Sequence, residues 1–77
     1  MKNTPTWHED KGNGNQVCRA SVVAKNNAYI EFIISTIDSC YVLKRVEGTD
    51  ENYIGSFREL SEAKTIGALI IILNVWE

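Results

Sequence analysis

The sequence feature that most constrains the fold is a series of alternating segments joined by very short polar turns. In residues 16–25 and 28–36, side chains at every second position share one face, which is the period of a β-strand. Residues 40–46 follow as a third strand after the turn at 37–39. Short turns of Asn, Asp, Ser and Lys residues connect neighbouring strands as antiparallel hairpins. The sequence therefore predicts an up-and-down antiparallel meander.

A fourth, shorter strand and a helix are expected after the polar loop at residues 47–52. The strand spans residues 53–57, and Ser56 and Glu59 then have the spacing of a capping box, with Ser56 as the N-cap residue. We therefore expect a helix over residues 58–75. The predicted fold class is α+β: a meander of about four strands followed by one C-terminal helix packed on the sheet, all in a single domain of 77 residues.

The second half of the expected helix is apolar almost all round. Gly67 could instead end the helix, and residues 68–76 would then form a fifth, buried strand, because β-branched residues suit strands. We favour the helix. One sheet covers only one side of a helix, so its outer apolar residues must meet something else. The residues expected at a partner or dimer interface are Ile66, Leu69, Ile70, Leu73 and Trp76.

The predicted sheet, residues 16–57, is preceded by a polar arm at residues 1–15. Trp7 is the large aromatic residue of this arm, and such a residue usually docks back onto the core or onto a partner. If Trp7 docks onto the core, the arm would cover part of the helix. That arrangement is the alternative to an exposed interface, and the sequence leaves the two open.

Composition and charge exclude several classes of function. The chain is 44% apolar and 23% charged, which is typical of a globular protein. Its net charge of −2 provides no strong field to attract nucleic acid or an anionic membrane. The longest apolar run, residues 68–73, is far shorter than the roughly 20 residues that span a bilayer. The first residues are polar, so we expect no export signal and a cytoplasmic location. In that compartment we expect Cys18 and Cys40 to be reduced thiols packed in the core, with a disulfide or a redox switch as the alternative.

The residues that could carry catalysis or bind a metal are few and scattered. His8 is the only histidine, and the side chains of its neighbours Glu9 and Asp10 diverge from it. A zinc site would need three or four ligands at suitable spacing. The paired acids at residues 50–51 lie in a polar loop, where solvation is expected. We therefore predict a protein that is not an enzyme and that holds no metal and no cofactor.

Residues 53–64 resemble a motif of DNA-binding domains. The strand Tyr-Ile-Gly-Ser-Phe, followed by a helix that opens with Glu-Leu-Ser-Glu-Ala-Lys, is similar to the strand-to-helix junction of three-stranded DNA-binding domains. These are the plant ethylene-response type and the arm-binding domains of phage integrases. The resemblance implies that the face of the sheet reads DNA, although the acidic balance disfavours it. This alternative requires the convergence of Arg19, Lys44, Arg45 and Arg58.

The whole chain is similar in style to small phage or prophage accessory proteins of the anti-CRISPR or host-takeover inhibitor type. The shared features are its length, its acidic balance, the meander plus helix and the lack of catalytic groups. The resemblance implies a non-catalytic protein-binding module that inhibits a host or defence complex in the host cytoplasm, with a homodimer as one form.

Two surfaces would compete to bind a protein partner. One is the apolar helix, and the other is the acidic loop, whose carboxylates could mimic phosphates and dock on a basic target. Charge reversal across Asp50 and Glu51 is predicted to leave the fold intact. The residues of the acidic loop are Glu47, Asp50, Glu51 and Tyr53.

Overall fold

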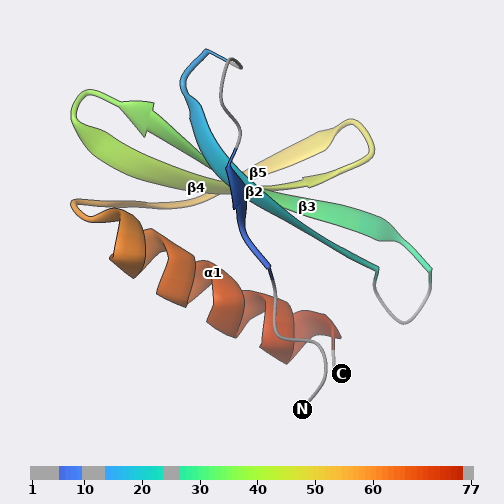
Figure 1. The fold of residues 1–77 in the computed structure, drawn as a ribbon. Coiled ribbons are helices and arrows are strands. Elements are labelled where there is room, and N and C mark those ends of the chain that lie inside the picture. Colours follow the sequence, from blue (N-terminus) through green and yellow to red (C-terminus); the bar gives the residue numbers. More distant parts are fainter. Residues whose placement is uncertain (1–5, 10–13, 24–26, 76–77) are drawn as a thin grey trace.

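The computed structural model is a five-stranded antiparallel sheet with one helix across one of its faces (Figure 1). It describes residues 6–9, 14–23 and 27–75. The strand order β1-β2-β3-β4-β5 follows the chain, so the sheet is a meander. The predicted α+β class is confirmed, with five strands rather than about four. The elements are β1 (His8–Glu9), β2 (Gln16–Val23), β3 (Tyr29–Ile37), β4 (Cys40–Glu47), β5 (Asp50–Phe57) and α1 (Leu60–Val75).

The additional strand, β1, comes from the segment that the sequence predicted to be a polar arm. His8 pairs with Arg19 and Glu9 pairs with Cys18, so β1 extends the sheet beyond β2. Both residues of β1 are exposed. A strand of two polar residues carries no alternating apolar pattern, which is why the sequence did not indicate it.

The β4–β5 connection is a tight turn and not the predicted polar loop. β4 ends at Glu47 and β5 begins at Asp50, which leaves only Gly48 and Thr49 between them. Gly48 has a φ of 64°, the positive value that such short hairpin turns need and that glycine adopts without steric cost. The strand predicted for residues 53–57 therefore starts three residues earlier. As a result, the acidic residues around this turn stand on paired strands.

The predicted capping box is wrong. Ser56 lies inside β5, opposite Val42, and its hydroxyl is 2.7 Å from that of Tyr53. The carbonyl oxygen of Glu59 accepts the first helical hydrogen bond, from the amide of Ala63 at 3.2 Å. Glu59 is thus the residue at the N-cap position. Pairing with β4 keeps the chain extended through residue 57, and this tertiary constraint overrides the local spacing of the capping box.

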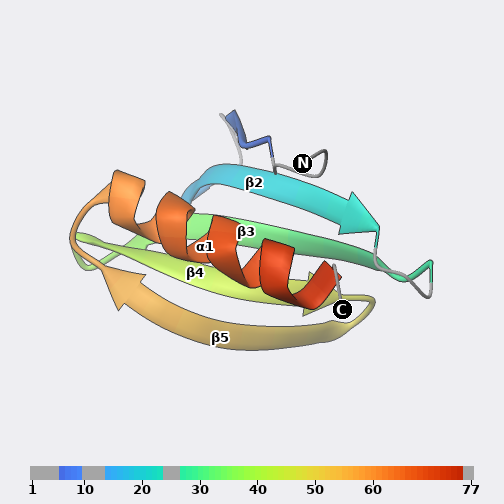
Figure 2. The same cartoon turned by 90° about the horizontal axis from the view of Figure 1, so that it is seen from below.

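The helix interpretation of the C-terminal segment is confirmed, because α1 continues through Gly67 to Val75. Residue 76 of the alternative strand lies outside the described residues. α1 runs across the sheet on one side only (Figures 1 and 2). Among the described residues, no helix has the length and apolar character needed to cross a bilayer.

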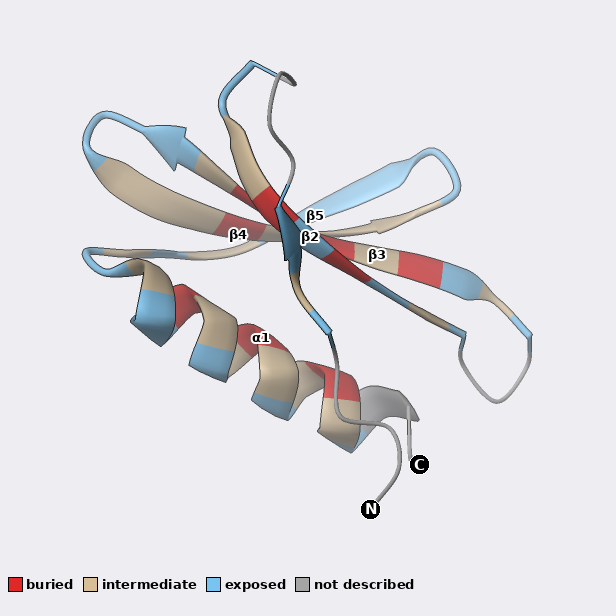
Figure 3. Cartoon of the chain, viewed as in Figure 1, coloured by how far each residue is buried: buried red, intermediate tan, exposed pale blue. Residues whose placement is uncertain are grey.

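The core lies between α1 and the face of the sheet that α1 covers (Figure 3). Its sheet residues alternate along β2 and β3, as the period of two requires, and β4 adds Leu43. Its helix residues recur at every fourth position, so α1 turns a narrow stripe of small and branched side chains toward the sheet. The buried cluster consists of Cys18, Ala20, Ile30, Phe32, Ile34, Leu43, Ala63 and Ile71.

Trp7 docks against this core and not on the outside of α1. It is half-buried and packs against the core cluster just before β1. A Cβ atom placed on Gly67 would lie 2.9 Å from Cζ2 of Trp7 and 3.5 Å from Cδ1 of Leu43. The indole ring therefore touches the bare backbone of α1 where the helix passes over the sheet. Only glycine permits so close an approach at this position.

We predict that Gly67→Ala destabilises the protein although alanine is the better helix former. The new methyl group collides with the indole ring, and such overpacking costs about 1–3 kcal/mol. In a Trp7→Ala background the collision is gone. The same substitution should then be neutral or stabilise by up to about 1 kcal/mol. Urea unfolding of the four proteins of this double-mutant cycle tests the contact. A stabilising Gly67→Ala in the wild-type background would contradict it.

Candidate protein-binding surfaces

The second face of the sheet is not covered by α1, and we call it the open sheet face. Cross-strand pairing assigns its residues, because partners in register point to the same side. Figure 1 shows α1 on the opposite side. The described residues of the open sheet face are His8, Gln16, Arg19, Ser21, Val23, Tyr29, Glu31, Ile33, Ser35, Ile37, Cys40, Val42, Lys44, Val46, Glu51, Tyr53 and Ser56.

Most of the exposed large hydrophobic side chains lie on this face. Among the described residues, Val23, Tyr29, Ile37 and Tyr53 are exposed by between 48% and 68%. The remaining two of this kind, Leu69 and Leu73, are on α1. At the centre of the open sheet face, Ile33 is only 8% exposed, yet it does not belong to the core cluster. Its cross-strand neighbours on β2 and β4 are Arg19 and Lys44, whose long aliphatic stems can cover it.

The charged side chains of the open sheet face form two neighbouring rows that run across the strands. In the first, the cationic row, Arg19, Ile33, Lys44 and Tyr53 are cross-strand partners. In the second, the anionic row, Ser21, Glu31, Val46 and Glu51 are partners. Consecutive residues of one face of a strand are about 7 Å apart, which is therefore the spacing of the rows.

Hydrogen bonds and ion pairs join the two rows. Nη1 of Arg19 lies 3.4 Å from Oε2 of Glu31, and Nζ of Lys44 lies 3.1 Å from Oε1 of Glu51. Oε2 of Glu31 also accepts hydrogen bonds from the hydroxyls of Ser21, at 3.5 Å, and Tyr29, at 3.3 Å. Partly exposed pairs of this kind contribute only about 0–1 kcal/mol each. The charges can therefore exchange partners at little cost.

The four cations of the DNA-binding alternative do not converge. Arg19 and Lys44 lie on the open sheet face, each beside a glutamate. Arg45 points to the opposite face, where its Nη2 is 2.8 Å from Oε1 of Glu47. Arg58 is exposed in the connection between β5 and α1. The basic patch that this alternative requires is not found among these residues.

The acidic residues around the β4–β5 turn do not gather on one surface either. Glu47 points to the side of the sheet that α1 covers, where it pairs with Arg45. Glu51 is on the open sheet face, paired with Lys44. Asp50, at the start of β5, is exposed and is the cross-strand partner of Glu47, so it points to the same side as Glu47. Tyr53, the remaining predicted residue of this loop, lies in the cationic row.

The predicted interface on α1 is reduced to two exposed leucines among the described side chains. Leu69 and Leu73 are exposed by 52% and 61%. Ile66 and Ile70 are partly buried and pack against the core. Trp76 lies outside the described residues. Among the described residues, the outer side of α1 thus exposes two large apolar side chains, against four on the open sheet face.

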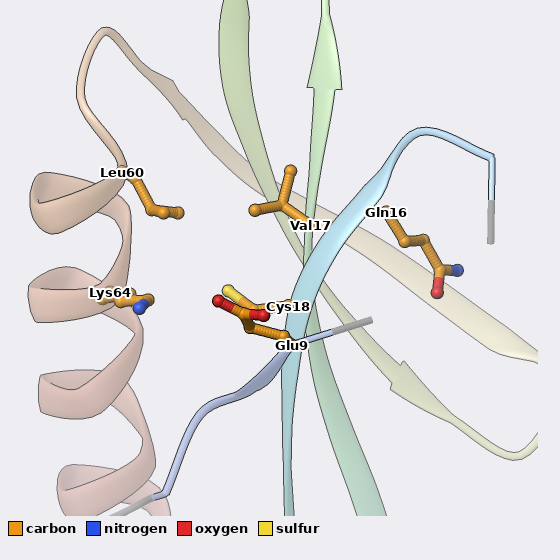
Figure 4. Close-up of a pocket in the computed structure, with 6 residues that line it drawn as sticks. All are labelled: Glu9, Gln16, Val17, Cys18, Leu60 and Lys64. Carbon is orange, nitrogen blue, oxygen red and sulfur yellow. The ribbon is translucent and has the colours of Figure 1, made fainter. Parts of the chain in front are cut away.

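A cleft of about 260 Å³ lies between α1 and the strands β1 and β2 (Figure 4). Figure 4 shows the side chains of Glu9, Cys18 and Lys64 reaching into the same space, whereas Gln16 points away from it. The volume is just below the roughly 300–1,000 Å³ of typical ligand pockets. The residues that line the cleft are Glu9, Gln16, Val17, Cys18, Leu60 and Lys64.

The cysteines and the histidine are spread over the fold. Cys18 is buried under α1 as expected, whereas Cys40, at the start of β4, is only half-buried and does not belong to the core cluster. The two cysteines do not form a disulfide. His8 is exposed on β1 beside Arg19. Within the described ranges, no group of three or more His, Cys, Asp or Glu residues is placed to hold a metal ion.

The chain matches no protein-family model, no curated protein and no solved structure.

The sequence-based candidates omitted Val23, Tyr29, Ile33 and Ile37. A signal was present for Val23, Tyr29 and Ile33, since they occupy alternate positions of two predicted strands. Ile37 was assigned to the predicted turn at residues 37–39, whereas in the structure it ends β3. The alternation separates two faces, but it does not say which of them a helix will cover. Both faces of β3 carry large apolar residues, so neither was marked as the outer one.

We predict that Leu69→Glu and Leu73→Glu, separately, leave the protein folded. Both side chains are mostly exposed, and substitutions at such sites usually change the free energy of unfolding by less than about 0.5 kcal/mol. Ile71→Ala, two residues from each, removes a fully buried side chain and should cost about 2–5 kcal/mol. Chemical denaturation of the three variants compares them. Similar losses in all three would show that the leucines belong to the core.

The structure also gives the size of the stability change expected when the charges of Asp50 and Glu51 are reversed. Reversing both charges breaks the ion pair between Glu51 and Lys44, which is exposed and is worth at most about 1 kcal/mol. Asp50→Lys with Glu51→Lys should therefore unfold cooperatively, close to the wild-type midpoint. Loss of the cooperative thermal transition would show that these carboxylates support the fold.

Proposed function

We propose that this chain is a non-catalytic protein-binding module and that it binds its partner with the open sheet face. The observation that carries the proposal is the concentration of exposed apolar side chains there: four of the six on the described residues. Apolar surface gathered on one face of a small domain often marks an interaction site. An antiparallel sheet can also simply leave one face in water, in which case that face is mainly polar.

The composition of the open sheet face suits a protein partner better than a polyanion. Tyr29 and Tyr53 are large, rigid and exposed, and tyrosine is enriched among the residues that dominate binding energy. The apolar side chain of Ile33 lies between the two cations, where a partner would exclude water. Because Arg19 and Lys44 each have a glutamate beside them, the described residues of this face offer no unbalanced positive charge to a phosphate backbone.

Binding through this face would cover a surface of the partner with a small, rigid sheet. Such occlusion is the way in which a protein of this size could inhibit a host or defence complex. That inhibitory role is the one implied by the resemblance to phage accessory proteins. It remains a prediction, as does a second contact through Leu69 and Leu73.

Site-specific photo-crosslinking tests the proposal. A photoreactive phenylalanine derivative replaces Tyr29 or Tyr53 in the full chain, and Thr65, exposed on α1, serves as the matched control position. After irradiation in a lysate of the cells that express the protein, positions 29 and 53 should each give a discrete adduct, and position 65 should give none. Excess wild-type protein should abolish the adducts, whereas a Tyr29→Asp, Tyr53→Asp variant should not.

The adduct is either a foreign protein or a second copy of the chain, and both outcomes support the proposed function. No adduct from positions 29 and 53 would refute binding through the open sheet face. To examine the outer side of α1, the photoreactive phenylalanine derivative replaces Leu69. An adduct from position 69 alone would move the binding site to α1.

A further inference from the structure

The pattern of charge on the open sheet face is self-complementary. Its cationic row and its anionic row are adjacent and parallel, and both run from β2 to β5. A two-fold axis that lies between two such faces, parallel to the rows and midway between them, exchanges the rows. Two copies related by this axis would place the cationic row of each over the anionic row of the other.

From this pattern we infer that the partner of the open sheet face is a second copy of the chain, stacked face to face about that axis. The inference rests on the proposed function, because it names the partner of the same site. The two copies would form an isologous dimer with four layers, in which the two sheets lie at the centre and the two helices lie outside. Face-to-face packing of antiparallel sheets, with side chains filling a space of about 10 Å, is a common architecture.

The individual contacts follow from the strand positions. The axis keeps each strand over its own copy and reverses its direction. Lys44 then faces Val46 of the second copy, between that copy's Glu31 and Glu51. Arg19 faces Ser21 of the second copy, beside the same Glu31. Each cation therefore keeps a carboxylate of its own chain and gains one from the other.

Exposed apolar side chains are covered by the same operation. On β3, the residue next to the cationic row is Ser35, paired with Val42, and the residue next to the anionic row is Tyr29, paired with Val23. The axis exchanges these positions too. Tyr29 of one copy thus lies over Ser35 of the other, and Val23 lies over Gln16, the β2 partner of Ser35. Two of the four exposed hydrophobic side chains of the open sheet face then lose contact with water.

The competing face-to-face arrangement is unfavourable. A two-fold axis parallel to the strands leaves each row over the same row of the second copy, so that the two cationic rows face each other and the two anionic rows face each other. Like charges held opposite each other at an interface are strongly destabilising. The charge pattern therefore selects one geometry as well as one partner.

The first test is the mass of the wild-type chain by light scattering behind a sizing column, in a dilution series at low and high salt. We expect a dimer that dissociates on dilution and dissociates more readily at high salt, because salt screens the exchanged ion pairs. A monomer at every concentration would overturn the inference.

A charge-swap experiment tests the geometry. One variant carries Arg19→Glu and Lys44→Glu, so that both rows are acidic. A second carries Glu31→Lys and Glu51→Lys, so that both rows are basic. Each should be monomeric alone because its rows repel their copies. Mixed in equal amounts, the two variants should form a heterodimer, since every facing row is then opposite in charge.

Controls separate the surface from general effects of charge. Arg58→Glu with Glu62→Lys changes the same kinds of charge on exposed residues away from the open sheet face, and should leave the dimer intact. Leu69→Glu should also leave it intact. Circular dichroism checks that every variant is folded. Should either charge-swap variant fail to fold, Arg19→Gln with Lys44→Gln replaces it and should weaken the dimer by about tenfold or more.

The outcomes are distinguishable. A heterodimer that forms only in the mixture supports the inference. A dimer that survives both charge-swap variants and is dissociated by Leu69→Glu overturns it in favour of the helix. If the chain is monomeric but its open sheet face crosslinks to a foreign protein, the inference that the partner is a second copy is wrong, and the proposed function stands. If neither a dimer nor an adduct forms, both fail.

Discussion

The packing of α1 on one face of the sheet is the constraint on which the other features depend. The helix approaches closely because its inner stripe includes the small residues Ala63 and Gly67. Phe32, Ile34 and Leu43 are fully or almost fully buried beneath it. Burial of side chains of this size, at about 1.5–3 kcal/mol each, is the main stabilising contribution available to a domain this small. At the edge of this interface, the indole ring of Trp7 packs against the backbone of Gly67.

The position of α1 also decides which part of the molecule is available for binding. Since α1 covers one face of the sheet, the side chains at the alternate strand positions remain on the uncovered face. Those side chains combine exposed aromatic and branched residues with two cation–glutamate pairs. The exposed ion pairs balance the charge of this face. They do not hold its side chains in one arrangement, because each pair contributes little to the free energy of folding. A partner with the reverse arrangement of charge can therefore replace their solvent contacts, and a second copy of the chain has that arrangement.

Local pattern predicted the elements whose residues repeat with a clear period, and missed those that depend on tertiary contacts. β2, β3 and β4 lie close to their expected ranges because their apolar residues alternate. The capping box at Ser56 was wrong because pairing with β4 extends β5 to Phe57. β5 begins early because Gly48 allows a tight turn. β1, with two polar residues, has no period to detect, and its place is set by pairing with β2.

The sequence by itself determined that three central strands alternate between two faces, that they are joined by short turns, and that an apolar helix follows. It could not decide which face the helix covers, because on β3 both faces carry large apolar residues: Phe32 on one, Ile33 on the other. Only the tertiary structure made that choice, by placing the stripe of Ala63, Gly67 and Ile71 against the face of Phe32. The physical reason is that a period of two separates the faces of a strand, whereas burial depends on contacts between residues far apart in the chain.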